Sequence, residues 1–322
     1  MKKWLSCLFS CGCVVLLLFG CSRESAVSTE QVKGKIFILS TTGVIDDLIQ
    51  MIVEDKIAHA ALIQGEIDPH SYELVKGDDE KIGQAHLFVY NGLGLEHGLS
   101  IQAAIKRHNR TLGIGEEIVQ QAAGKILQTG GQIDPHIWMD ASLWVLSVKP
   151  LVEAICSLDP ENSDFYIAQG KEAEKKLLSL HQYIQKKMEA VPEARRYLVT
   201  THDAFSYFAK AYLTKAEDWK ERAQAPEGLA PEGQLSFFDI QRLVNHILDH
   251  KISVIFAESN LNQDSLDKIV DICRNKGVKV EVSSSKLYGD TLFPKKEADE
   301  EKSLYIKTMK HNVDMITYAW TG

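Results

Sequence analysis

Two kinds of hydrophobic pattern, one typical of strands and one typical of helices, alternate along the first half of the chain. Short apolar runs at residues 35–39, 61–65 and 87–92 are typical of buried strands. Between the first two runs, residues 44–55 place apolar side chains at helical spacing, and residues 141–157 show the same helical pattern. Alternating strands and helices predict an α/β lobe over this part of the chain.

One helical pattern differs from the others in its length, because it runs from residue 162 to residue 193. Pro192 marks its end. At 1.5 Å per residue such a helix exceeds roughly 40 Å, which is longer than packing within one domain usually requires. We therefore expect a rigid helix that joins two lobes. Its apolar stripe consists of Leu177, Leu180, Ile184 and Met188.

The alternation of strands and helices starts again after this helix. The predicted fold class is therefore α/β, with two α/β lobes joined by one long rigid helix. The predicted boundaries are 35–160 for the first lobe, 161–193 for the linking helix and 194–322 for the second lobe. The second lobe has predicted strands at 196–201, 253–259 and 278–284, helices at 204–213 and 264–274, and a closing helix at 301–320.

The first 34 residues resemble a targeting segment and a tether. A short basic start precedes the apolar stretch 8–19, which is too short to span a membrane as a helix. The following LLFGC is similar to a lipobox, in which Cys21 is lipidated. We expect a signal peptide over 1–20 and a lipid-anchored polar tether over 21–34; a plain signal peptide cut nearby is the alternative. The protein is then exported, to the periplasm or the cell surface, as a membrane-anchored lipoprotein.

The composition fits a soluble globular body, with 45% hydrophobic and 25% charged residues among 322. The net charge is −8, and no run of lysine or arginine indicates a nucleic-acid partner. We expect a monomer. Beyond the N-terminal segment the only cysteines are Cys156 and Cys273, and their positions in different halves of the chain favour two separate thiols over a disulfide.

The tetrapeptide Ile-Asp-Pro-His occurs twice, at residues 67–70 and 133–136. A repeat fold would share more than four residues, so the two copies indicate two loops with one task. Proline fixes its own φ and extends the preceding aspartate, which gives a rigid turn that presents a histidine. A lone loop histidine is usually exposed and idle, but two in the same turn make His70 and His136 candidate metal ligands. Their aspartates, Asp68 and Asp134, are candidates to steady the loops or the imidazoles.

His202 is a third candidate, because it follows an apolar strand and opens a helix. Ligands bind at the carboxyl ends of strands in α/β sheets. The alternative is that His202 or Asp203 caps the helix. Two candidate histidines precede the long helix and one follows it, so a shared site would lie between the lobes, where pockets are common.

These residues lie in motifs that resemble one family. The chain is similar, over about residues 35–320, to the TroA-like (cluster A-I) metal-specific solute-binding proteins of ABC importers, and most to its YtgA-type branch, which is linked to iron. The motifs are DPHSYE, NGLGLE, DPHIWMD, VTTHDAFSYFAKAY, PEGLAPEGQLS and FAESNLNQDSLDKI.

The resemblance implies one divalent metal ion in the cleft between the lobes, carried as cargo to an ABC transporter permease. It places the family's ligands on His70, His136, His202 and Asp290. From the residues alone, Asp299 and Glu258 remain open as alternatives to Asp290.

Three imidazoles and one carboxylate suit iron, manganese or zinc. Zinc-specific members of the family often have a histidine-rich loop in the first lobe, and residues 109–132 contain no histidine, which favours manganese or iron. Zinc would still bind most tightly in vitro. The other eight histidines are not expected to be ligands; His97, beside the NGLGLE turn, is expected near the metal without binding it.

Other functions remain open as alternatives. An exported zinc hydrolase would need an open coordination position, and the chain has no HExxH motif. A surface adhesin that keeps the fold is compatible with a lipid anchor. Binding of a metal chelate or haem has one argument in its favour, Trp138 beside His136. Because the four ligands that the resemblance implies would leave no open position on the metal, we expect no enzyme activity.

Overall fold

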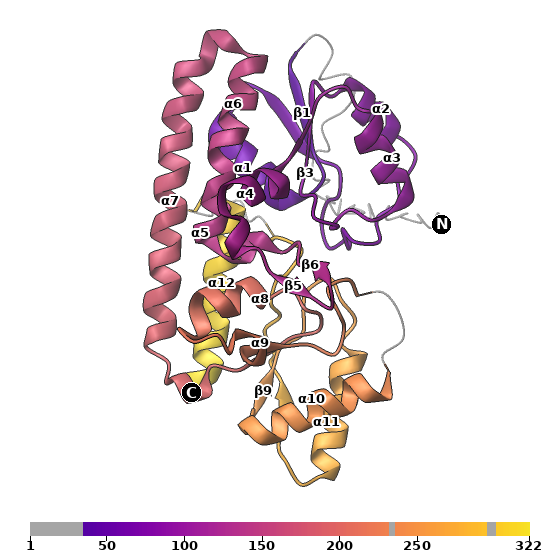
Figure 1. The fold of residues 1–322 in the computed structure, drawn as a ribbon, viewed down its shortest axis with the longest axis vertical. Helices are drawn as coiled ribbons and strands as arrows, with labels where there is room; N and C mark the ends of the chain where they lie inside the picture. Colours follow the sequence, from indigo (N-terminus) through magenta and orange to yellow (C-terminus); the bar gives the residue numbers. More distant parts are fainter. Residues whose placement is uncertain (1–34, 232–235, 295–300) are drawn as a thin grey trace, which may run out of the picture.

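A computed structural model describes residues 35–231, 236–294 and 301–322. The expected signal peptide, Cys21 and tether lie outside the described residues, as do Asp299 and part of the PEGLAPEGQLS motif. Figure 1 shows two lobes stacked along the longest axis of the molecule, with long helices along one side.

The N-terminal lobe is built on a four-stranded parallel sheet in the order β2-β1-β3-β4. Alternate residues of β1 face opposite sides: Phe37 and Leu39 pack toward α2 and α3, and Ile38 packs toward α1. The strands are β1 (Phe37–Ser40), β2 (Ala58–Ala61), β3 (Leu87–Tyr90) and β4 (Thr111–Gly113), and the helices are α1 (Gly43–Val53), α2 (Asp78–Gln84), α3 (Leu99–Arg107) and α4 (Ile114–Ala122).

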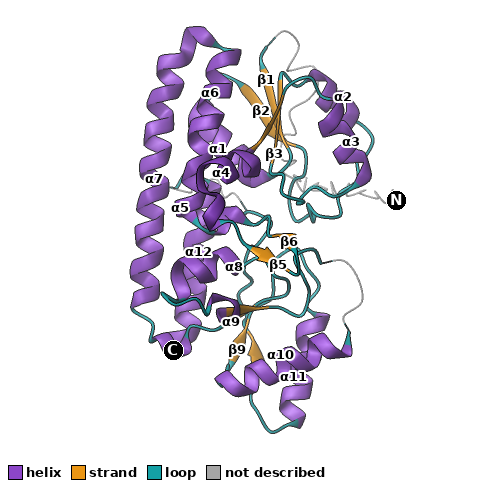
Figure 2. Ribbon diagram, viewed as in Figure 1, coloured by secondary structure: helices purple, strands orange, loops and turns teal. Residues whose placement is uncertain are grey.

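The C-terminal lobe has much shorter strands, as Figure 2 shows. Two parallel pairs are formed, β7 with β8 and β9 with β10. An apolar core from these strands and from α10 and α11 holds the lobe together. Its elements are β7 (Leu198–Val199), α8 (Ser206–Phe208), a π-helix (Ala209–Leu213), α9 (Trp219–Arg222), β8 (Ala223–Gln224), α10 (Phe237–His250), β9 (Val254–Ile255), α11 (Asp264–Asn275) and β10 (Glu281–Val282).

Helix α7 (Ser163–Glu189) runs beside both lobes, as its apolar stripe predicts (Figure 1). Leu177, Leu180, Ile184 and Met188 are all buried. The closing helix α12 (Leu304–Thr321) packs against α7. Its N-terminus is fixed to the first lobe, because the Asp47 carboxylate of α1 accepts hydrogen bonds from the Ser303 hydroxyl and from the N–H groups of Leu304 and Tyr305.

The segment Ala141–Leu158 is the one stretch among the described residues that is long and apolar enough to cross a membrane, by length and composition only. It consists of α5 (Ala141–Trp144), a 3-10 turn (Val145–Ser147) and α6 (Val148–Leu158), and half of it is buried inside the protein. Its helices pack against α7.

A β-hairpin precedes His136 and consists of β5 (Gln128–Thr129) and β6 (Gln132–Ile133). Gly130 and Gly131 form its turn with φ of 60° and 84°, a conformation that glycine adopts without steric cost. The hairpin base is held from the second lobe, because the Tyr207 hydroxyl accepts from the Leu127 N–H and donates to the Asp134 carbonyl, each at 3.0 Å.

One expected strand is displaced. The apolar run 61–65 predicts a strand there, but β2 covers Ala58–Ala61. Residues 58–60 are alanine and histidine, so the apolar run in the sequence begins only at Ala61, the last residue of the strand. The thiols of Cys156 and Cys273 are free, which confirms that they form no disulfide; Cys273 is buried and Cys156 is half-buried.

Candidate metal centre

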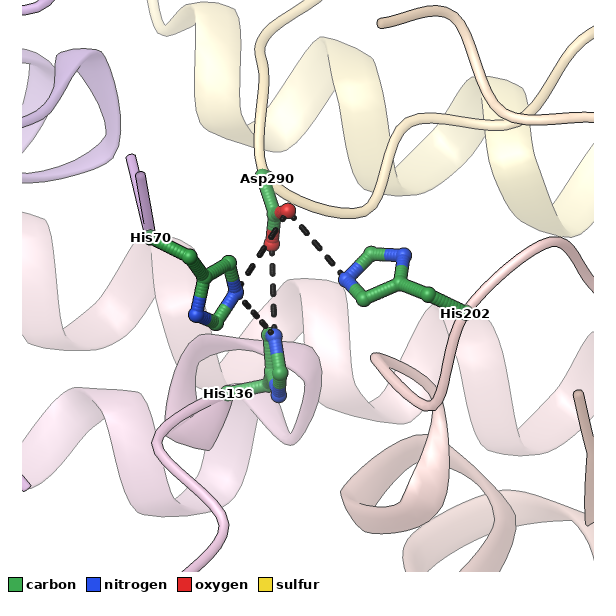
Figure 3. A group of neighbouring side chains, drawn as sticks. All are labelled: His70, His136, His202 and Asp290. Carbon is green, nitrogen blue, oxygen red and sulfur yellow. Dashed lines mark hydrogen bonds and ion pairs between the residues drawn. The ribbon is translucent and has the colours of Figure 1, made fainter. Parts of the chain in front are cut away.

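The two Ile-Asp-Pro-His turns bring His70 and His136 side by side (Figure 3). The Nε2 atoms of the two imidazoles lie 3.2 Å apart, although 66 residues separate them in the chain. In each turn the aspartate carboxylate accepts a hydrogen bond from the histidine N–H at 2.9 Å. The shared tetrapeptide therefore folds into the same local turn twice.

The second lobe adds an imidazole and a carboxylate to this pair. His202 follows β7, and Asp290 lies in the loop before α12. Oδ2 of Asp290 is 3.2 Å from Nε2 of His202 and 3.7 Å from Nε2 of His70, and Oδ1 is 3.4 Å from Nε2 of His136. All four side chains are buried, and their ligand atoms lie within 4.8 Å of one another. The structure thus brings together the four residues that the family resemblance selects.

Four of the distances between these atoms, 3.2 to 3.7 Å, are close to the spacing of ligands around one ion. Two atoms bound to one ion at about 2.0–2.1 Å in tetrahedral geometry lie about 3.3 Å apart. Among the described residues, the buried oxygens of Asp290 have no neighbouring donor apart from the imidazoles grouped around them. Because a buried carboxylate is costly without compensation, this arrangement fits a cation at the centre.

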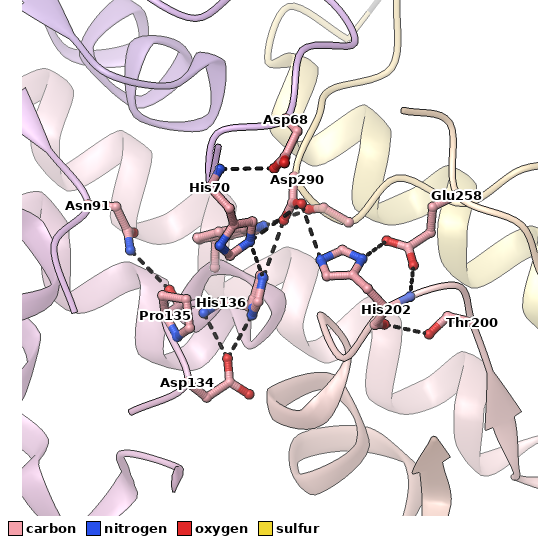
Figure 4. Close-up of polar contacts among 12 residues, drawn as sticks. Asp68, His70, Asn91, Asp134, Pro135, His136, Thr200, His202, Glu258 and Asp290 are labelled. Atoms are coloured by element: carbon pink, nitrogen blue, oxygen red, sulfur yellow. Dashed lines mark hydrogen bonds and ion pairs between the residues drawn. The ribbon is translucent and has the colours of Figure 1, made fainter. Parts of the chain in front are cut away.

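Two carboxylates contact the outward nitrogens of the imidazoles (Figure 4). Asp134 lies 2.8 Å from Nδ1 of His136, and Glu258 lies 2.9 Å from Nδ1 of His202. Glu258 also accepts hydrogen bonds from the N–H groups of Thr201 and His202. A carboxylate at Nδ1 holds the proton there and leaves the Nε2 lone pair directed at the centre.

The aspartate of the first turn holds the backbone of His70 and not its imidazole. The carboxylate of Asp68 accepts from the Ser71 hydroxyl at 2.7 Å and from the His70 N–H, but no contact of Asp68 with the imidazole ring is found among the described residues. Besides Asp290, the ring is surrounded by other imidazoles, with centroids 5.2 Å away for His136 and 5.8 Å away for His97.

Burial and charge set the proton affinities of the group. Burial lowers the pKa of His70 to about 3, against the charge of Asp290. Burial also acts to lower the pKa of His136, but hydrogen bonds to Asp134 and Asp290 outweigh it and raise the pKa to about 9. For His202, burial is outweighed by the charges of Glu258 and Asp290, which hold its pKa well above the ordinary value. A metal ion must therefore displace protons from His136 and His202.

The loop that presents Asp290 is fixed from several directions. The Trp138 indole N–H donates to the Gly289 carbonyl at 2.9 Å, which links the first lobe to the loop. The side chain of Asn312 on α12 bonds both the N–H and the carbonyl of Tyr288. Gly289 is required there, because a Cβ atom would collide with Glu258, which contacts His202.

Two further residues, Asn91 and Glu96, hold the turn beside the site, and the sequence alone does not predict their contacts. The amide of Asn91 donates to the Pro135 carbonyl at 3.0 Å, next to His136. Buried Glu96 accepts from the N–H groups of Asn91 and Gly92 and from the Thr41 hydroxyl. Both lie in the NGLGLE motif, which indicated a turn beside the site but not these contacts.

The remaining candidates lie outside the group. His97 lies near His70 but is not part of the four-residue group, and Glu258 contacts His202 from behind. The N-cap of α8 is Phe205, so neither His202 nor Asp203 caps it. The indole of Trp138 is engaged with Gly289, which leaves the chelate or haem alternative without its argument.

Comparisons with known proteins agree with this geometry. The sequence model of the family described as the periplasmic zinc-uptake complex component A matches residues 38–319. The metal-binding protein YtgA of Chlamydia pneumoniae is 36% identical over 327 residues, which cover 100% of this chain and 95% of that protein. The manganese-binding lipoprotein MntA of Bacillus subtilis is 28% identical over 306 residues and 94% of each chain. The crystal structure of Fe(III)-bound YtgA from Chlamydia trachomatis, 34% identical, superimposes with a TM-score of 0.83 over 89% of this chain and 98% of that one.

Proposed function

This chain belongs to the periplasmic zinc-uptake component A family, and we propose that it binds one metal ion through His70, His136, His202 and Asp290 and delivers it to a membrane permease. The coarser function follows from the family: the protein is a metal-binding substrate-binding component of ABC transporters and not an enzyme. The observation that supports the ligand assignment most strongly is the convergence of four buried ligand atoms at the spacing of ligands around one ion.

The proposed cargo is iron, with manganese and zinc as the competing ions. The donor set accepts all three metals. Iron is placed first because the YtgA structure that resembles this chain is described as Fe(III)-bound. An affinity measured in vitro does not decide between the metals, because zinc outcompetes iron and manganese at most nitrogen and oxygen sites.

The proposed location is outside the inner membrane, with the protein anchored through a lipid on Cys21. Support comes from the periplasmic description of the family and from the name of the lipoprotein MntA. We propose the boundaries that the sequence predicts, with a signal peptide over residues 1–20, two lobes over 35–160 and 194–322, and a linking segment over 161–193. The observed α7, Ser163–Glu189, falls inside that segment.

Two measurements test the proposal. Elemental analysis of protein purified from its native host, without added metal, is expected to find one iron per chain. Uptake of radioactive iron by cells that also contain the cognate permease is expected to require the protein and to be abolished by Asp290→Ala. A purified protein without stoichiometric metal, or uptake unchanged by Asp290→Ala, would contradict it. Nothing in the part of the chain that the structure describes favours the adhesin alternative.

A further inference from the structure

A cavity of about 580 Å³ lies between the lobes and reaches the proposed metal site. The first lobe contributes its walls from the start of α1, from β2 and from the segment that leads to Pro69, and the second lobe contributes the loop from Asp290 to Pro294. Of the four clustered side chains, only Asp290 is among the described residues that line it. The cavity therefore meets the site on its carboxylate side.

We infer that this cavity is the entrance route for the cargo, and that Glu66 and Asp46 in its wall form an encounter site for a hydrated divalent cation. The inference rests on the proposed function, because it assumes that the four-residue group binds the ion. It adds a second, weaker site that a metal ion occupies before it reaches the buried group.

The acidic side chains are graded by burial. Glu66 is exposed, the side chain of Asp46 is 24% exposed, and the side chain of Asp290 is 0% exposed. An ion that moves inward along this series would exchange one carboxylate for the next. A second observation points to a cation at the inner end, since both oxygens of Asp290 are buried and, among the described residues, only the imidazoles of the proposed site face them. Figure 4 shows this carboxylate between His70 and His202.

The other groups in the wall leave its net charge negative. His59 engages one oxygen of Asp46, with Nδ1 2.8 Å from Oδ1, and its Nε2 lies 3.0 Å from the Gln50 side chain. Asp47 is not available to the ion, because its carboxylate caps α12. Lys302 is the one lysine or arginine among the described lining residues, and it is exposed. The net charge of the wall is thus negative.

Hydration explains why a separate encounter site is needed. Six water molecules occupy roughly 180 Å³ at about 30 Å³ each, so the cavity admits a hydrated ion. The buried group has no such room, because its ligand atoms lie within 4.8 Å of one another. A cation must therefore lose its water before it binds there, and oxygen ligands along the cavity replace that water stepwise. Carboxylates in a partly buried cavity also concentrate cations and raise the association rate.

The test is a stopped-flow measurement of Co²⁺ binding to the full chain, followed by the visible absorption of the bound ion. In the variant Asp46→Asn/Glu66→Gln, the association rate is expected to fall about threefold to tenfold at low ionic strength, with much less effect at high salt. The dissociation rate is expected to fall in parallel, because the ion leaves by the same route. The equilibrium affinity then changes little.

Further variants separate the route from other roles. Gln64→Trp, at an exposed lining position, is expected to slow association and dissociation together, and Lys302→Met to speed association. Glu153→Gln/Asp271→Asn removes the same charge from α6 and α11, away from the lining residues, and is expected to leave the rates within about twofold.

Association that is unaffected by both Asp46→Asn/Glu66→Gln and Gln64→Trp would overturn the route. Faster dissociation with unchanged association would show instead that Asp46 and Glu66 only position the bound ion, which also overturns it. Failure of the unaltered protein to bind one Co²⁺ would refute the proposed function, whatever the variants do.

Discussion

The two Ile-Asp-Pro-His turns have the same sequence but hold their histidines differently. In the turn at 133–136, Asp134 is fully buried and contacts both the N–H and the ring of His136. In the turn at 67–70, Asp68 is partly exposed and contacts the His70 N–H and the Ser71 hydroxyl. The tetrapeptide therefore determines the turn, while its surroundings determine whether the aspartate steers the imidazole.

This difference follows from the position of each turn. Residue 134 is fixed at the base of the hairpin by Tyr207 of the second lobe, and Asn91 bonds the Pro135 carbonyl. Among the described residues, no side chain from the second lobe bonds the backbone of the first turn. We expect the second turn to be the rigid partner at the metal site and the first turn to be the adaptable one.

The largest expected effect comes from removing the imidazoles. His136→Ala is expected to lower metal affinity by more than about 100-fold. Removing a residue that binds the metal weakens binding more than removing a residue that only contacts such a ligand, which typically costs about 10–100-fold. His70→Ala should also weaken binding strongly, but less than His136→Ala. Calorimetric titration measures both, with His181→Ala as the control, because His181 bonds Tyr212 outside the group. Equal affinity in all variants would remove the site assignment.

A sharper test replaces the two aspartates. Asp134→Asn is expected to cut metal affinity about 10–100-fold, because an amide still accepts from the backbone N–H but removes the negative charge at the ring. Asp68→Asn should change it by less than about threefold. Both variants are compared by competition with a chelator of known affinity. Equal losses would show that the two turns play the same role.

Acidity should reveal the same asymmetry. The pKa of His136 is raised to about 9 and that of His70 is lowered to about 3. At neutral pH the metal must displace a proton from His136 but none from His70. Affinity is therefore expected to rise as pH increases from about 6.5 to 9, by about tenfold per unit for each proton displaced. Calorimetry in buffers of different ionisation enthalpy counts those protons; a flat profile over this range would contradict the raised pKa.

The smallest effect concerns the hairpin. Tyr207→Phe leaves the Leu127 N–H and the Asp134 carbonyl unpaired and should lower the free energy of unfolding by about 1–3 kcal/mol. Metal affinity should fall only a few-fold. Ser71→Ala is the matched change in the first turn and should alter stability by less than about 0.5 kcal/mol. Denaturant unfolding of both variants provides the comparison, and equal destabilisation would mean that the second turn is not specially anchored.

Much of this site could be predicted from the sequence, because repeated rigid turns and a strand-end histidine are local signals. Asp290 could not be chosen from the residues alone. It is 88 residues beyond His202, and only tertiary structure separates it from Glu258, which lies behind His202 instead. The family resemblance supplied that choice. The roles of Trp138 and Tyr207 depend on contacts between lobes, which no local pattern encodes.

The fold shows the same division. The apolar stripe of α7 predicted a long helix, and Ser163–Glu189 confirms it. The strands of the second lobe are only two residues long. The apolar runs that predicted them are longer, because they include flanking residues that form loops in the structure. Helices α2 and α3 were not predicted, because seven and nine residues give too few turns for a clear period.

The most direct test is a crystal structure of the protein loaded with one equivalent of iron, with anomalous diffraction recorded at the iron edge. The proposal predicts one anomalous peak about 2.0–2.2 Å from Nε2 of His70, His136 and His202 and from a carboxylate oxygen of Asp290. A peak elsewhere in the molecule, or one that lacks any of these four ligands, would contradict it.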